Sequence, residues 1–163
     1  MLSPEARVRP NIGRLNPARR PIPMQLIDFP KRCLAIAETL NRWVGALSAL
    51  DQGRRAKVAR YADAIADTLD RAQAYAARLA QFPRDRAAQR GLIRELGRIA
   101  GYLETLVGVL QHHLDGRKLA GVKRRLEQLG PGRGGLRAAH ELRMDRLLAA
   151  EGYFRALADS LRA

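Results

Sequence analysis

The feature that most constrains the fold is an apolar stripe in the middle of the chain. Between Gly91 and Leu114, aliphatic side chains recur at steps of three and four residues. At 3.6 residues per turn, this spacing places them on one face of an α-helix. The stripe consists of Leu92, Ile93, Leu96, Ile99, Ala100, Leu103, Leu106, Val107 and Leu110. The sequence therefore predicts a long amphipathic helix, which we expect to be the central helix of the protein.

Helical spacing also recurs on both sides of this stripe. Alanine, leucine and arginine dominate the chain and aromatic residues make up only 5% of it, a composition that favours helices over strands. We predict an all-α fold, an antiparallel bundle of four to five helices over residues 30–163. The expected helices run from Asp28 to Asp51, Arg54 to Ala80, Asp85 to Leu114, Arg117 to Leu129, and Leu136 to Leu161. Asp115-Gly116 fits either a turn or a kink, and the spacing does not separate the two.

The first 29 residues differ from the rest in being rich in proline and arginine. Six of the eight prolines fall within the first thirty residues, where each removes a backbone donor and disfavours helix just before it. Arg14, Arg19 and Arg20 lie between these prolines. Residues 1–29 are therefore predicted to form an extended basic arm that lies along the bundle, a neighbouring subunit or a ligand.

The chain carries a large excess of positive charge. It has 30 Lys and Arg against 16 Asp and Glu, a formal net charge of +14. The excess lies at the two ends, with seven basic and two acidic residues in 1–33 and sixteen and nine in 84–163. Such a distribution attracts polyanions, nucleic acid above all. Compositional drift towards arginine is the alternative explanation for the high charge.

One basic cluster stands out near the expected fourth helix. Asp115 and Glu127 are the only acidic residues in a stretch of about 20 residues that holds seven basic ones. The cluster consists of Arg117, Lys118, Lys123, Arg124 and Arg125, with Arg133 and Arg137 beyond a glycine-rich loop. That loop, Gly130 to Gly135, lacks the Gly-Lys-Ser/Thr ending of a phosphate-binding loop and is predicted to be a connector. We expect the cluster, together with Arg14, Arg19 and Arg20, to bind nucleic acid.

The sequence contains no motif of a metal site or an enzyme. His112 and His113 point about 100° apart on a helix, and His140 lacks the His-Glu-x-x-His spacing of zinc proteases. Asp63, Asp67 and Asp70 share one helix face without the Glu-x-x-His pattern of di-iron bundles. We expect these three carboxylates to pair with Lys57, Arg60 and Arg71 on the same helix. No cofactor and no catalytic residue is predicted.

Two further features concern where the chain resides. The single cysteine, Cys33, has no partner for an internal disulfide and is expected to be a small buried side chain. No run of about 20 apolar residues is present, so no membrane span is predicted, and the start of the chain lacks the apolar segment of a secretion signal. A cytoplasmic location is the expectation.

Two functions from different classes fit these features. The first is a non-enzymatic basic helical bundle that binds the phosphate backbone of RNA or DNA, as an accessory subunit of a larger nucleoprotein complex. Since few aromatic residues are available for base stacking, such binding is expected to carry little sequence specificity. The alternative is a helical protein–protein interaction module, an adaptor or effector that self-assembles or binds an acidic protein or an anionic membrane surface.

Overall fold

A computed structural model of the chain describes residues 29–127 and 144–163. These residues form six α-helices and no strand, which confirms the predicted all-α fold. The helices are α1 (Phe29–Arg42), α2 (Val44–Ser48), α3 (Gln52–Gln81), α4 (Arg86–Leu110), α5 (Gly116–Glu127) and α6 (Met144–Arg162). Almost all of the predicted arm and the whole glycine-rich loop lie outside the described residues.

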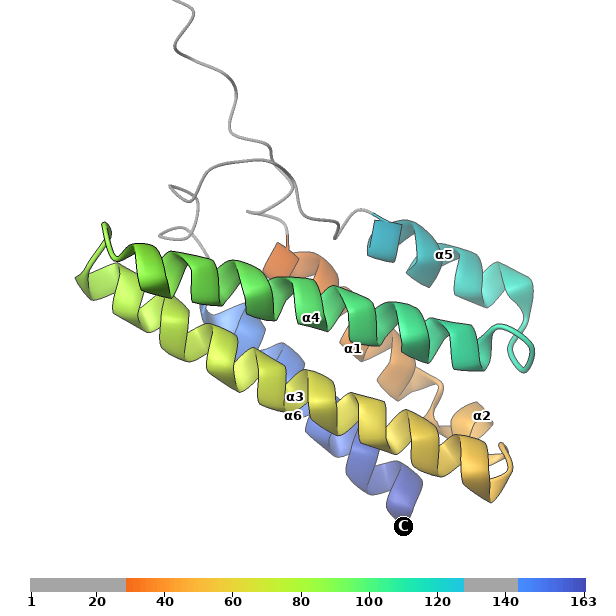
Figure 1. Ribbon diagram of the computed structural model, residues 1–163. Coiled ribbons are helices and arrows are strands. Elements are labelled where there is room, and N and C mark those ends of the chain that lie inside the picture. The colour runs from red at the N-terminus through yellow and green to blue at the C-terminus, as the bar shows by residue number, and fades with distance from the viewer. Residues whose placement is uncertain (1–28, 128–143) are drawn as a thin grey trace, which may run out of the picture.

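Helix α3 is the element against which the other long helices pack. It lies between α4 and α6 and runs antiparallel to both (Figure 1). Helix α1 packs against α6, and α5 returns alongside α4 to contact α4 and α1. The expectation that α4 would be the central helix is therefore wrong, because α3 takes part in the two largest interfaces and α4 in only one of them.

The core is built from the apolar faces of these helices. On α3 the apolar face is buried, and seven of its residues are Val58, Ala62, Ile65, Leu69, Ala72, Ala76 and Leu79. Four of the seven are alanine or valine, whose small side chains let α4 and α6 approach closely. Phe154 of α6 and the leucines of α4 fill the space between the helices. On α4 two members of the predicted stripe are not buried: Ile93 is 44% exposed and Ala100 is partly exposed.

The predicted first helix is divided in two at Trp43. The Trp43 amide donates to the carbonyl of Leu40, three residues back, at 3.0 Å, so the α-helical ladder is interrupted there. Helix α2 then starts at Val44 and ends at Ser48. This break raises the number of helices to six, although neither glycine nor proline occupies the position.

Helices α3 and α4 are each capped at their start by an aspartate. The Asp51 carboxylate accepts from the Arg54 amide at 3.0 Å, and Asp85 accepts from the amides of Ala87 and Ala88 at 2.9 and 3.0 Å. Helix α4 ends at Leu110, four residues earlier than predicted. Residues 111–115 then form a turn, so the open question of a turn or a kink is answered by a turn.

Gly91 of α4 lies in different surroundings from Gly97 and Gly101 of the same helix. A Cβ atom on Gly91 would come within 2.4 Å of the Tyr75 ring of α3, so this ring packs directly against the backbone of α4 there. A Cβ atom on Gly97 or Gly101 would meet no described atom within 4 Å. No described helix therefore packs closely against Gly97 or Gly101, and both glycines are exposed.

Cys33 is buried within α1, as predicted. Burial raises the pKa of its thiol to about 12. The thiol is thus neutral near pH 7 and is a poor nucleophile. Its role is that of a small apolar side chain in the core.

Candidate nucleic-acid interface

Helix α5 carries half of the basic residues predicted to bind nucleic acid: Arg117, Lys118, Lys123, Arg124 and Arg125. The other half, Arg14, Arg19, Arg20, Arg133 and Arg137, lies outside the described residues. The geometry of the predicted site can therefore be followed on α5 alone.

Helix α5 is held against the bundle by a narrow apolar seam. Leu119 and Val122 are only 2% and 1% exposed, and the helix contacts α4 and α1. Arg117, Lys123 and Arg124 are exposed. Because the apolar seam fixes one side of the helix, the charged side is directed to the solvent.

Four cations of α5 form no ion pair within the described part of the chain. No ion pair joins Arg117, Lys123, Arg124 or Arg125 to a carboxylate of residues 29–127 or 144–163. Asp115, the nearest acid in sequence, accepts instead from the backbone amide of Arg117 at 3.0 Å. These side chains therefore remain available to an external anion.

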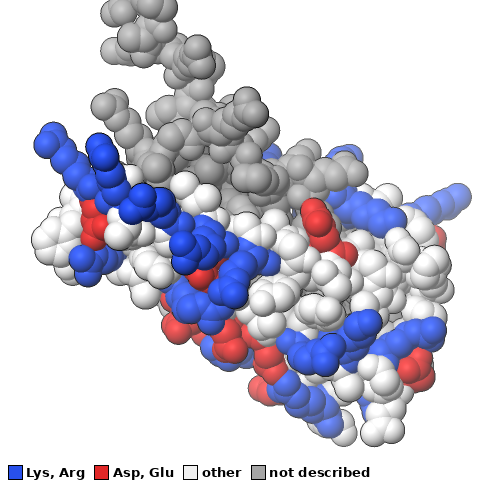
Figure 2. Space-filling model, in the orientation of Figure 1, with Lys and Arg blue, Asp and Glu red and all other residues white. Residues whose placement is uncertain are grey.

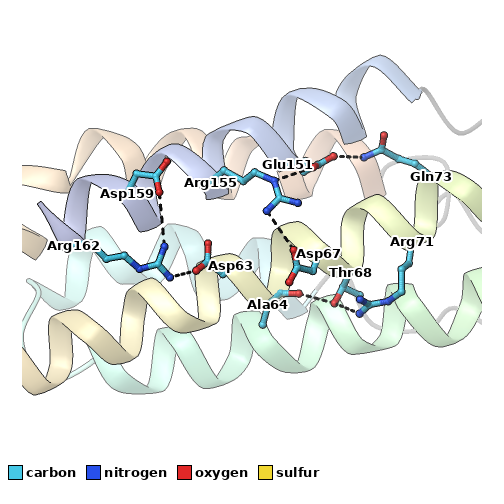
Figure 3. Close-up of polar contacts among 10 residues, drawn as sticks. All are labelled: Asp63, Ala64, Asp67, Thr68, Arg71, Gln73, Glu151, Arg155, Asp159 and Arg162. Carbon is cyan, nitrogen blue, oxygen red and sulfur yellow. Dashed lines mark hydrogen bonds and ion pairs between the residues drawn. The ribbon is translucent and has the colours of Figure 1, made fainter.

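The interface between α3 and α6 uses arginine in a different way (Figure 3). Arg155 of α6 reaches Asp67 of α3 at 3.3 Å and Glu151 of its own helix at 3.0 Å. The hydrogen bond to Glu151, and to a smaller extent the one to Asp67, raises the pKa of Arg155 above its ordinary value. Arg162 likewise pairs with Asp63 of α3 and with Asp159 of α6. Both arginines join two helices.

This interface corrects the predicted partners of the α3 carboxylates. Asp63 and Asp67 pair with α6 and not with Lys57, Arg60 or Arg71 of their own helix. Short-range spacing cannot reveal this, because the partners lie 88 and 99 residues away in sequence.

A second group of exposed arginines, which we did not predict as a site, lies on α4. Arg86, Arg90, Arg94 and Arg98 follow one another at intervals of four residues, and all are exposed. Figure 2 shows Lys and Arg side chains gathered over this first half of α4, with acidic side chains between them. We call these four residues the arginine row. The signal in the sequence was the repeated spacing of four.

Most of the arginine row has no ion-pair partner. Arg98 lies 3.6 Å from Glu95, whose carboxylate is buried and also binds Arg71 of α3 at 3.0 Å. Arg86, Arg90 and Arg94 make no ion pair with the residues that the structure describes. Glu95 thus neutralises only one end of the row.

The turn between α3 and α4 lies at the other end of the row. Its Phe82 side chain is 58% exposed. An open hollow of about 510 Å³ lies beside it, lined by Arg78, Gln81, Phe82, Pro83, Arg84 and Asp85. The hydrogen bond from the Ala88 amide, and to a smaller extent the one from Arg78, holds the pKa of Asp85 below its ordinary value. The carboxylate in this hollow is thus ionised and already bonded.

Other kinds of site find no support among residues 29–127 and 144–163. No group of three or more His, Cys, Asp or Glu side chains there could hold a metal ion. His112 and His113 are exposed in the turn after α4, and His112 forms a hydrogen bond with the neighbouring Gln111. No helix of these segments combines the length and apolar character needed to cross a bilayer.

Comparison of the chain with protein-family models, curated proteins and solved structures gives no significant match.

Proposed function

We propose that this chain is a non-enzymatic protein that binds the phosphate backbone of nucleic acid, as an accessory subunit of a larger nucleoprotein complex in the cytoplasm. One observation carries the proposal: Arg117, Lys123 and Arg124 of α5 are exposed and have no ion-pair partner in the described residues, whereas Arg155 and Arg162 of α6 are matched by carboxylates of α3. Unpaired Lys and Arg on a fixed helix favour phosphate contacts over interhelical pairing.

The chemistry of such a contact is mainly electrostatic. Each phosphate that Lys or Arg neutralises releases condensed counterions, so affinity falls steeply with salt. If six to ten phosphates are contacted, affinity falls by about 10³–10⁵-fold between 50 and 200 mM salt. Since α5 presents no exposed aromatic side chain in the described residues, its contacts carry little base information.

The proposal is tested by fluorescence anisotropy with labelled RNA and DNA over a salt series. The salt slope is the slope of log affinity against log salt concentration. Replacing Lys123, Arg124 and Arg125 by glutamine is expected to lower the magnitude of this slope by about two to three. The same variant is expected to weaken binding to unrelated nucleic-acid sequences equally. The matched control replaces Lys31, Lys57 and Arg60, which are exposed on α1 and α3. This control removes the same charge and is expected to leave the slope nearly unchanged.

The alternative function, a helical protein–protein interaction module, makes the opposite prediction. A protein of that kind would not bind either nucleic acid at 50 mM salt. That result would overturn the proposed function, as would an equal loss of affinity in the control and in the α5 variant, since bulk charge would then explain binding.

A further inference from the structure

We infer that the α3–α4 turn and the arginine row form a site for single-stranded nucleic acid, in which one unpaired base stacks on Phe82 and the following phosphates lie along α4. This inference rests on the proposed function and extends it, because it names the form of nucleic acid and a second surface. Its parts are the exposed aromatic ring, the hollow beside it and the three unpaired arginines.

Phe82 lies in a place where it adds little to the core. Its ring is more exposed than that of any other phenylalanine in the described residues. The Arg78 guanidinium lies 6.0 Å from the ring centroid, so the ring already carries a cation–π contact. An exposed aromatic ring beside arginines is the arrangement on which single-stranded bases stack.

The turn is also held in a fixed shape before any ligand binds. The Asp85 carboxylate accepts from two amides of α4 and pairs with Arg78, while Gln89 donates to the Pro83 carbonyl at 3.0 Å. Asp85 therefore repels phosphate less than a free carboxylate would. Gln81 and Arg84 line the same hollow and offer hydrogen-bonding groups to a base edge and a phosphate.

The arginine row continues from the turn along the outside of α4. With a rise of 1.5 Å per residue, neighbouring arginines are about 6 Å apart along the helix axis, and the whole row spans about 18 Å. Arg86, Arg90 and Arg94 have no ion pair within the described residues. A flexible strand whose first base lies in the hollow is thus offered three cations in succession.

Single-stranded nucleic acid is favoured over a duplex by the aromatic ring. A base can stack on Phe82 only if it has left its own helix, as in a single strand, a loop or a bulge. The arginine row alone would bind a single strand or a duplex, since it provides positive charge and no group that distinguishes the two.

The test uses the full-length protein with a labelled 20-nucleotide poly-dT strand and a duplex of the same length. Replacing Phe82 by alanine is expected to weaken binding of the single strand by about fivefold to hundredfold, with no change in the salt slope or in duplex binding. Phe82→Trp is expected to retain the affinity, because it restores a stacking surface. Circular dichroism checks that both variants keep their helices.

A second variant addresses the arginine row. Replacing Arg86, Arg90 and Arg94 by glutamine is expected to lower the single-strand salt slope by about two, as three contacts at about 0.7 each require. The variant of Lys31, Lys57 and Arg60 again serves as the control of equal charge.

The outcomes separate this inference from the proposed function. If the α5 variant loses affinity while the Phe82 and row variants bind the single strand like the parent protein, the inference is wrong and the proposed function stands. If the parent protein binds no nucleic acid at 50 mM salt, both fail. If Phe82→Ala weakens binding to phosphatidylserine vesicles and not to the single strand, the turn is a membrane contact and the inference is again overturned.

Discussion

Arginine side chains differ between the α3–α6 interface and the outer face of α4. At the interface, Arg155 and Arg162 each pair with one carboxylate of α3 and one of α6. On the outer face, Arg86, Arg90 and Arg94 repeat without a carboxylate partner in the described residues. Total charge does not distinguish these groups; the position of the acids does. Matched substitutions in the two regions should therefore affect stability in one and binding in the other.

The largest expected difference separates two phenylalanines. Phe154 of α6 is fully buried, and its replacement by alanine is expected to lower the free energy of unfolding by about 3–5 kcal/mol. Phe82 lies in the exposed turn, so Phe82→Ala is expected to change the free energy of unfolding by no more than about 0.5 kcal/mol. Urea unfolding followed by Trp43 fluorescence measures both. Equal losses would mean that the turn belongs to the core.

Two glycines of α4 provide the next contrast. Alanine favours a helix over glycine by about 1 kcal/mol, so Gly97→Ala, which meets open space, is expected to stabilise the protein by that amount. Gly91→Ala makes the same gain but forces the Tyr75 ring to move, at a cost of about 1–3 kcal/mol. In thermal unfolding, the melting temperature of Gly91→Ala should be lower than that of Gly97→Ala. In a Tyr75→Ala background this gap should close, and a gap that persists would contradict the steric explanation.

A comparison of single arginines divides the two regions directly. Arg155→Gln removes pairs that are partly exposed, so the expected loss of stability is below about 1 kcal/mol, without a change in the salt slope of nucleic-acid binding. Arg90→Gln is expected to leave stability unchanged and to lower the salt slope of single-strand binding by about 0.7. Urea denaturation measures the stability of both variants, and fluorescence anisotropy over a salt series measures their salt slopes. A lowered slope for Arg155→Gln would contradict the division.

The smallest expected effect concerns the pH dependence of the α4 cap. The pKa of Asp85 is lowered from 3.8 in the folded chain, so the folded state binds fewer protons than the unfolded state just below that value. The stability that Asp85 contributes is present above pH 3.8 and is lost as the pH falls through the folded pKa. Asp85→Asn keeps a capping oxygen that does not titrate. The variant should therefore show a shallower loss of stability below about pH 4, and an unchanged slope would contradict this assignment.

The sequence predicted the fold well because the relevant information was local. The period of about 3.6 located the buried faces of α3 and α4, and the start of α4 was located by Asp85, whose side chain reaches amides two and three residues away. The break at Trp43 was missed because neither residue type nor spacing marked it. The central place of α3 was missed because it depends on which helices pack together, and this is not encoded within any one helix.

The candidate site was predicted only in part, because contacts between helices distant in sequence are not visible in the local pattern. The basic residues of α5 formed an obvious cluster, since few acids lie near them in sequence. The arginine row was overlooked because Asp85 and Glu95 lie next to its members in sequence, although the fold engages Asp85 with Arg78 and helix amides and buries Glu95. The partners of Asp63 and Asp67 were wrong because the favoured pairs join helices that are distant in sequence.

The narrow attachment of α5 has a consequence for how the protein responds to a ligand. Twelve residues are marginal for an independent helix in water, so α5 depends on its contacts through Leu119 and Val122. Its amides should exchange with deuterated solvent sooner than those of α3, whose contacts with α4 and α6 are far more extensive. A polyanion bound across α5 would slow that exchange. The rate of amide exchange in one short helix would then report occupancy without any label on the ligand.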